Sequence, residues 1–257
     1  MNQNIMEIDD KSAYDPDFIE NVIIPMLTGL VQKKLFSAAY DLDGKIIIAT
    51  DMFAGYFGYS SMNQIQGKSL HDILAEIGKL EQLNLIDHLN KIRLKVINTG
   101  SIVTHLNLIP FQNKILTTLV YNIPIFRTDG KVVATRTIAR KIDLISSVAA
   151  MNNNLIHGEP ICKVKPWELH LSPRQNEILY LLTIGFSQNQ VADYLGITRG
   201  TISKIISETI CPLFEIDGSN TKLLVKTIIA SKYFERASNP FLEPRIIEID
   251  SNIELYI

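Results

Sequence analysis

The residues from Leu171 to Ile210 read LSPRQNEILYLLTIGFSQNQVADYLGITRGTISKIISETI, and they decide the fold of the C-terminal part of the chain. Two serines in this stretch are each followed three residues later by a glutamine, Ser172 by Gln175 and Ser187 by Gln190. With this spacing the hydroxyl and the amide satisfy each other's free backbone N–H groups at the start of a helix. The stretch therefore predicts two helix starts from local chemistry alone.

The connections between these helices are expected to be short. Pro173 stands at a first helical position, where its missing N–H costs nothing, and Gly185 follows the first helix, where left-handed backbone is common. Gly196 and Ile197 then lead to Thr198, which we expect to cap a third helix. Apolar residues recur three and four positions apart, so each helix has one buried face. The expected inner residues are Ile178, Leu181, Leu182, Val191, Ala192, Leu195, Ile202, Ile205, Ile206 and Ile210.

This stretch resembles the LuxR-type (GerE-type) helix-turn-helix of bacterial transcription regulators. The matching residues are Leu171, Ser172, Pro173, Arg174, Glu177, Gly185, Ala192, Leu195, Ile197, Thr198, Thr201 and Ile202. The resemblance implies an all-α domain of four helices whose third helix lies in the DNA major groove. The candidate DNA-contacting residues that the resemblance implies are Gln188, Asn189, Thr198, Arg199, Gly200, Thr201, Ser203, Lys204 and Ser207. Gly200, Ser203 and Ile205 replace basic residues and a histidine that are usual in the family.

The charge of this region predicts how it would bind DNA. The whole chain carries a formal charge of −2, and residues 166–236 contain seven basic and seven acidic side chains. Because phosphate neutralisation supplies most non-specific affinity, a neutral domain is expected to bind promoter DNA as a homodimer over two half-sites. Ser219 is the expected cap of the fourth helix, which usually supplies a dimer contact in LuxR-type proteins.

The N-terminal half changes to a pattern of strands. Leu35–Leu42 and Lys45–Ala49 flank an Asp-Gly turn and predict a hairpin. Short helices are expected after residue 51 and a long helix over Leu80–Ile97. Three further strands are predicted at Ser101–Pro110, Lys114–Phe126 and Lys131–Arg140. Before the hairpin, Asp15-Pro16-Asp17 predicts a helix start, and Pro25 is expected to kink or end that helix.

This order of elements resembles a PAS domain. The residues that carry the resemblance are Tyr40–Ile46, Phe57–Ser60, Gly67–Leu70, Ile123–Ile125 and Asp129–Gly130. The resemblance implies an α+β fold with a five-stranded antiparallel sheet and helices. It also implies that this domain senses a signal or mediates dimerisation, and that it can enclose a small-molecule ligand. Candidate ligand-binding residues are Tyr56, Phe57, His88, His105 and Tyr121.

The expected organisation follows from these two resemblances. Residues 1–33 form a helical cap, 34–144 the PAS domain, 145–166 a helical linker and 167–236 the helix-turn-helix domain. Residues 237–257 form a tail that alternates apolar residues and predicts a hairpin or an added edge strand. In the stretch from Lys141 to Trp167, a spacing of three and four suits a helix face that pairs with a second copy or packs on its own sheet; the residues are Ile142, Ile145, Ala149, Asn152 and Ile156.

The cofactor is left open by the sequence. His88 lies on the expected long helix, where haem-binding PAS sensors have a histidine, so haem is one candidate. No cysteine precedes Cys162, which excludes the thiol adduct of flavin photosensors. Cys162 and Cys211 show no metal-binding spacing, and no metal site is expected. The acidic N-terminus and the lack of a long apolar run predict a cytoplasmic protein that does not enter the membrane.

An enzymatic function is suggested by Asp41-Leu42-Asp43-Gly44, which resembles the nucleophile loop of haloacid-dehalogenase-type phosphatases. There the first aspartate attacks phosphorus beside magnesium. Lys45 stands where threonine is usual, and a hairpin turn explains the same residues, so no enzyme is expected. The sequence is also compatible with a PAS-based interaction module that has weakened DNA binding, and with an autoinducer receptor.

Overall fold

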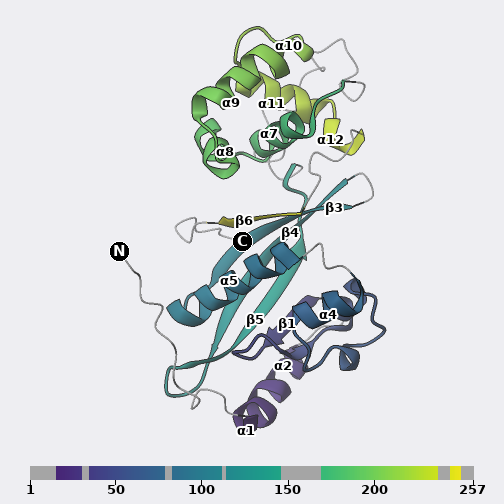
Figure 1. The fold of residues 1–257 in the computed structure, drawn as a ribbon, viewed down its shortest axis with the longest axis vertical. Coiled ribbons are helices and arrows are strands. Elements are labelled where there is room, and N and C mark those ends of the chain that lie inside the picture. Colours follow the sequence, from purple (N-terminus) through teal and green to yellow (C-terminus); the bar gives the residue numbers. More distant parts are fainter. Residues whose placement is uncertain are drawn as a thin grey trace. The chain divides into compact units, whose positions relative to one another are not determined.

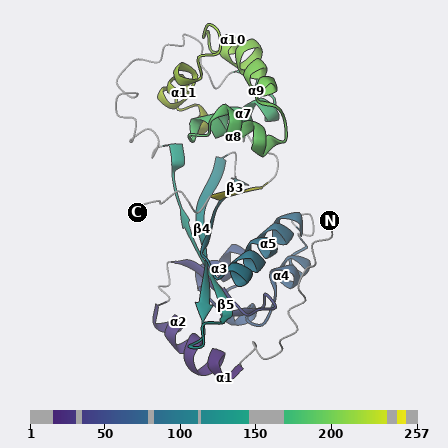
Figure 2. The ribbon, with the colours of Figure 1, turned by 90° about the vertical axis from the view of Figure 1, so that its left-hand side faces the viewer.

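The computed structural model of the chain contains two compact units (Figure 1 and Figure 2). It describes residues 16–30, 35–78, 83–111, 114–145, 169–236 and 244–249. One unit spans residues 1–106, 118–140 and 246–257, and the other spans 107–117 and 141–245. Within the described ranges, no helix is long and apolar enough to cross a membrane.

The described residues contribute six strands to one sheet, in the order β2-β1-β5-β4-β3-β6. The strands are β1 (Phe36–Tyr40), β2 (Ile46–Ala49), β3 (Val103–Phe111), β4 (Lys114–Phe126), β5 (Val132–Lys141) and β6 (Arg245–Ile249). The first five confirm the predicted antiparallel PAS sheet, with β1 paired to β2 and to β5. Part of the tail adds a sixth strand, β6, at the sheet edge beside β3, which agrees with the predicted alternative of an added edge strand. The predicted hairpin partner of β6 lies outside the described residues.

Helices cover both faces of the sheet. The N-terminal helix packs Ile19, Ile23 and Leu27 against Ala39 and Ala134. On the other face lie α3 (Asp51–Tyr56), η3 (Met62–Gln64), α4 (Leu70–Glu76) and α5 (Leu83–Thr99). There Phe53 and Ile73 pack with Ala38, and Ile92 packs with Val103. The two faces form separate cores because side chains alternate along each strand.

The N-terminal helix is built from α1 (Pro16–Phe18), the π-helical turn η2 (Ile19–Ile23) and α2 (Ile24–Leu30). It does not end at Pro25. The backbone N–H of Ile24 donates to the carbonyl of Ile19, five residues back, which widens the turn just before the proline. A proline cannot donate an N–H, so the wider turn lets the helix continue without that bond.

The unit that spans residues 107–117 and 141–245, called the helical unit below, contains the predicted helices with three differences. Its elements are α7 (Pro173–Thr183), α8 (Gln188–Leu195), α9 (Arg199–Ile205), η7 (Ile206–Ile210), α10 (Cys211–Leu213), α11 (Thr221–Ala230) and α12 (Tyr233–Arg236). The third helix runs on from α9 through a π-helical turn to Leu213. The predicted Ser219 cap is wrong: Asn220 Oδ1 accepts from the Leu223 N–H at 3.0 Å and caps α11. The short helix α12 was not expected.

Candidate functional site

The helix-turn-helix consists of α8, a short turn and α9, and hydrogen bonds fix both helix ends. Ser187 and Gln190 form the predicted reciprocal cap of α8. The helix ends at Gly196, whose φ of 64° is the left-handed backbone that glycine adopts without strain. Thr198 Oγ1 then accepts from the Thr201 N–H at 3.1 Å and caps α9. The turn geometry therefore follows from local residues.

A shared core holds these helices together. Val191, Ala192 and Ile202 are at most 2% exposed, and so is Ile178 of α7. Ile206 and Ile210 are also fully buried, while Ile205 is only half-buried. The buried isoleucines determine which side of α9 faces outward.

The outer side of α9 carries most of the candidate DNA-binding residues. Exposed among them are Asn189, Thr198, Arg199, Gly200, Thr201 and Lys204, while Ser203 and Ser207 are half-buried. Lys204 Nζ lies 3.9 Å from Glu208 Oε2, and both side chains are more than 60% exposed. Such an exposed pair holds the lysine only weakly, so its ammonium group can turn to another anion.

Gln188 has a different environment from the other candidates. Its side chain is half-buried, and its Nε2 donates to Thr221 Oγ1 at 2.9 Å. This bond joins the first residue of α8 to the first residue of α11. Gln188 therefore helps to position α8 in the structure.

Arg174 has a structural role that the sequence pattern did not reveal. Its Nη2 donates to the carbonyl of Leu195, at the end of α8, at 2.8 Å. Its Nη1 donates to Glu177 Oε2 at 2.9 Å, and the Glu177 side chain is only 7% exposed. Arg245 Nε lies 3.2 Å from the other carboxylate oxygen, without the angle of a hydrogen bond. Arg174 is thus a positioning residue for the end of α8.

The PAS sheet contains a buried polar cluster on the face that packs against α3, α4 and α5. Asn122 Nδ2 donates to the Val103 carbonyl at 3.3 Å and lies 3.1 Å from His105 Nδ1. Thr137 Oγ1 donates to Asn122 Oδ1 at 2.9 Å. The amide nitrogen donates in this arrangement, so His105 Nδ1 is the acceptor.

One hydroxyl beside this cluster is unpaired. Thr135 is 2% exposed and stands two residues before Thr137 in β5, so the two side chains share a face. Within the described ranges, Thr135 Oγ1 has no hydrogen-bond partner. A buried hydroxyl without a partner costs free energy unless another group supplies a hydrogen bond. The cluster is therefore a candidate site for the polar end of a ligand.

The other candidate ligand residues lie in separate surroundings. Tyr56 and Phe57 pack edge to face, with ring centroids 5.1 Å apart, and Tyr56 is half exposed. His88 is exposed on α5, with Nε2 3.8 Å from Glu248 Oε1, and does not join the buried cluster. Tyr121 alternates with Asn122 along β4 and faces the opposite side of the sheet. Of the five candidates, only His105 belongs to the polar cluster.

The aspartates of the first hairpin form a turn. Asp41 Oδ1 accepts from the N–H groups of Asp43 and Lys45 at 3.0 and 2.8 Å. Gly44 takes a φ of 85°, and Arg93 Nη1 donates to the Leu42 carbonyl at 2.7 Å. The Asp41 carboxylate thus stabilises the hairpin, which accounts for the residues that resemble a phosphatase loop.

Comparison with known proteins gives the same architecture. A family model described as helix-turn-helix matches residues 180–216. The structure of the phage VqmA–DPO complex is similar over 91% of this chain and 100% of that chain, with 17% identity and a TM-score of 0.55. The fold is that of a PAS domain followed by a helix-turn-helix domain. The predicted PAS fold and the predicted helix-turn-helix are confirmed, and the domain boundaries stay predictions.

Two further structures are similar at lower scores. The Vibrio cholerae VqmA dimer without target DNA, described as informative on LuxR-type receptors, has 14% identity and a TM-score of 0.49. It covers 88% of this chain and 96% of its own. The PAS domain of Bordetella pertussis BvgS has 12% identity and a TM-score of 0.40, over 52% of this chain and 96% of its own. A sequence search of curated proteins gave no match.

Proposed function

We propose that the protein is a homodimeric, LuxR-type transcription regulator that binds promoter DNA through α9 and receives a small-molecule signal in its PAS domain. The observation that carries this proposal is the outer side of α9, where Arg199 and Lys204 are exposed on a capped helix. Among solved relatives in fold, VqmA has been crystallised with DPO and in a ligand–DNA complex.

The small number of cations on α9 makes a second copy important. Arg199 and Lys204 are the only basic residues of α9, so a dimer presents four such groups. Four phosphate contacts correspond to a slope of about −3.6 in the logarithm of the association constant against the logarithm of salt concentration. Half that slope is expected of one protomer, whose binding would be weak at physiological salt.

DNA binding by the full chain over a salt series tests this interface. A random-sequence DNA pool supplies the ligand. Arg199→Ala is expected to weaken binding and to reduce the slope by about 1 per protomer if Arg199 contacts phosphate. Lys91→Ala removes an exposed charge from α5 and is the matched control. Equal effects of the two substitutions, or no binding at any salt concentration, would contradict the proposal.

We propose that dimerisation uses the N-terminal helix of the PAS domain. Val22 and Met26 are 45% and 47% exposed, and residues four apart lie on one helix face. Apolar side chains at this spacing suit a self-complementary contact between two copies. Light scattering is expected to show a dimer for the native chain and a monomer for a Val22→Glu, Met26→Glu variant. A dimer that survives both changes would place the contact elsewhere.

We propose that the ligand binds at the Thr135 hydroxyl, beside the polar cluster of His105, Asn122 and Thr137. Thr135→Val removes a hydroxyl that has no partner in the described residues, so it should not lower thermal stability. The same change should weaken a ligand that hydrogen-bonds there. Thr137→Val, which breaks the 2.9 Å bond to Asn122, is expected to lower stability instead.

Titration with DPO, the compound bound by VqmA in the solved complexes, provides a first ligand assay. Binding that Thr135→Val weakens would support the site. Binding that is the same in native and Thr135→Val protein would argue against it, and so would a large loss of stability in that variant.

A second function, a PAS-based interaction module with weakened DNA binding, is favoured by the uncharged Gly200 and Ser203 on the outer side of α9. The two functions differ in the salt series. The interaction module predicts weak DNA binding even at low salt, and the regulator predicts strong binding at low salt that weakens steeply as salt is added.

A further inference from the structure

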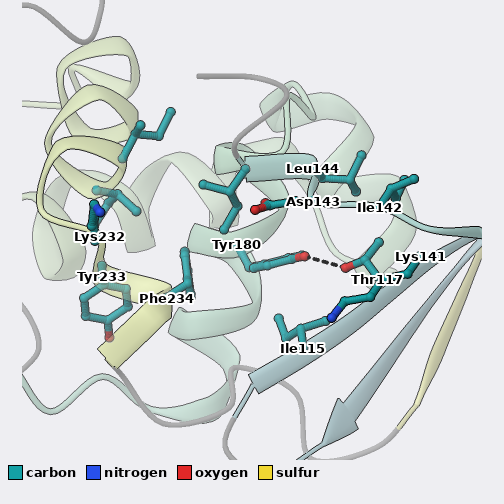
Figure 3. Close-up of a pocket in the computed structure, with 13 residues that line it drawn as sticks. Ile115, Thr117, Lys141, Ile142, Asp143, Leu144, Tyr180, Lys232, Tyr233 and Phe234 are labelled. Atoms are coloured by element: carbon teal, nitrogen blue, oxygen red, sulfur yellow. Dashed lines mark hydrogen bonds between the residues drawn. The ribbon is translucent and has the colours of Figure 1, made fainter. Parts of the chain in front are cut away.

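The unit that spans residues 107–117 and 141–245, which includes one end of β4 and of β5, contains a cavity of about 310 Å³ (Figure 3). The polar cluster in the PAS sheet does not line this cavity. The wall of the cavity is partly polar, and the apolar part comes from Ile142, Leu144, Tyr180, Ile228, Ile229 and Phe234. This volume is at the lower end of the range of small-molecule sites. The cavity therefore has the size and surface for a compact apolar group.

Three charged residues also line the cavity. They are Lys141, Lys232 and Asp143, so the lining carries one more positive charge than negative. Within the described residues, no carboxylate forms an ion pair with either lysine. Both lysine side chains are exposed. This arrangement favours an anion over a cation or a neutral molecule.

A hydroxyl pair closes one part of the wall. Tyr180 Oη lies 3.0 Å from Thr117 Oγ1, as the dashed line in Figure 3 shows. Burial raises the pKa of Tyr180 to about 12, and the nearby charge of Asp143 acts in the same direction. Tyr180 thus stays a neutral phenol and does not repel an anion.

Lys232 provides an independent observation, because its backbone is strained. Its φ of 53° is left-handed, and it follows Ser231, the C-cap of α11, at a position where glycine is usual. A lysine in a conformation that glycine adopts freely indicates a use for its side chain. Glu215, with a φ of 54° after α10, has the same backbone and does not line the cavity.

We propose that this cavity binds a small amphipathic monocarboxylate. The apolar body lies against the isoleucines and aromatic rings, and the carboxylate pairs with Lys232, while Lys141 lines the other side of the cavity (Figure 3). Asp143 disfavours a second negative charge, which limits the ligand to a single acidic group. The site goes beyond the proposed ligand site of the PAS domain and uses different residues.

Calorimetric titration of the full chain tests the proposal, with octanoate as the probe and octanamide as its neutral counterpart. Octanoate is expected to bind more tightly than octanamide. Lys232→Gly removes the ammonium group and relieves the backbone, so it should weaken octanoate binding by up to about fivefold, the upper range of an exposed ion pair. The thermal midpoint of this variant should be unchanged or raised.

Two further variants make the result decisive. Glu215→Gly relieves the same backbone strain without touching the cavity and should leave octanoate binding unchanged. Ile229→Trp fills the cavity and should abolish binding of both probes. Equal affinity for the two probes, or octanoate binding that neither Lys232→Gly nor Ile229→Trp alters, would overturn the proposal.

Discussion

The substitution Gly200→Lys adds a cation to α9 and tests whether this helix faces the DNA phosphates. Gly200 is the exposed second residue of α9, and a Cβ there would meet only Thr198 Oγ1, at 3.6 Å. That distance is an ordinary contact, so a lysine side chain fits without displacing its neighbours. Gly200→Lys therefore adds one positive charge to the outer side of a helix whose packing is unchanged.

The expected gain in affinity follows from counterion release. One more phosphate contact adds about 0.9 to the magnitude of the salt slope, which at about 0.15 M salt corresponds to roughly fivefold tighter binding per protomer. Two protomers on one duplex would gain roughly thirtyfold if both lysines reach phosphates. The gain should be larger at lower salt, because the added contact carries its own salt dependence.

Fluorescence anisotropy with labelled duplex DNA measures both quantities. Gly200→Ala is the matched control, because it adds about 0.5–1 kcal/mol of helix stability without a charge. We expect Gly200→Ala to bind DNA as the native chain does and Gly200→Lys to bind more tightly with a steeper slope. If the two variants share one affinity and one slope, α9 does not face the phosphates and the reasoning is refuted.

Three further predictions concern the supports of the helix-turn-helix. Arg174→Ala removes the hydrogen bonds to Leu195 and Glu177 and should lower the free energy of unfolding by about 2 kcal/mol in urea titrations. An unchanged free energy of unfolding would show that Arg174 does not position α8. Gly196→Ala forces a Cβ into left-handed backbone and should cost about 1 kcal/mol in the same assay; no loss would mean that the turn relaxes freely. Cys211 is fully buried, and burial raises the pKa of its thiol. In a Cys162→Ser background it should react with a disulfide reagent only on unfolding, and rapid reaction in native protein would contradict its burial.

Local chemistry explains why so much of the helix-turn-helix could be predicted from the sequence. The Ser172 and Ser187 caps need only a glutamine three residues on, and the turn needs only Gly196. The error at the fourth helix was also local, because Ser219 and Asn220 are adjacent and both residue types can cap. The sequence does not determine which of the two the chain selects, since that depends on how α11 packs.

The remaining features depend on residues far apart in the chain. Strand β6 lies at the sheet edge, and its Glu248 pairs with Lys95 at 2.7 Å, a contact across 153 positions. The polar cluster joins His105, Asn122 and Thr137 from three strands, so no local pattern contains it. Asn122 is a polar residue within an otherwise apolar strand, and this is the feature of the sequence that could have indicated the polar cluster. The DNA-binding role of α9 and the ligand site remain predictions.

Selection of bound duplexes from a random DNA pool by the full chain tests the central claim most directly. The regulator account predicts an enriched sequence with two related half-sites about one helical turn apart. It also predicts that Arg199→Ala, an exposed residue at the start of α9, either relaxes the preference at one position of each half-site or weakens binding throughout. A pool that shows no enrichment, or an enriched sequence that Arg199→Ala, Lys204→Ala and Gly200→Lys all leave unchanged in affinity and preference, would contradict the account.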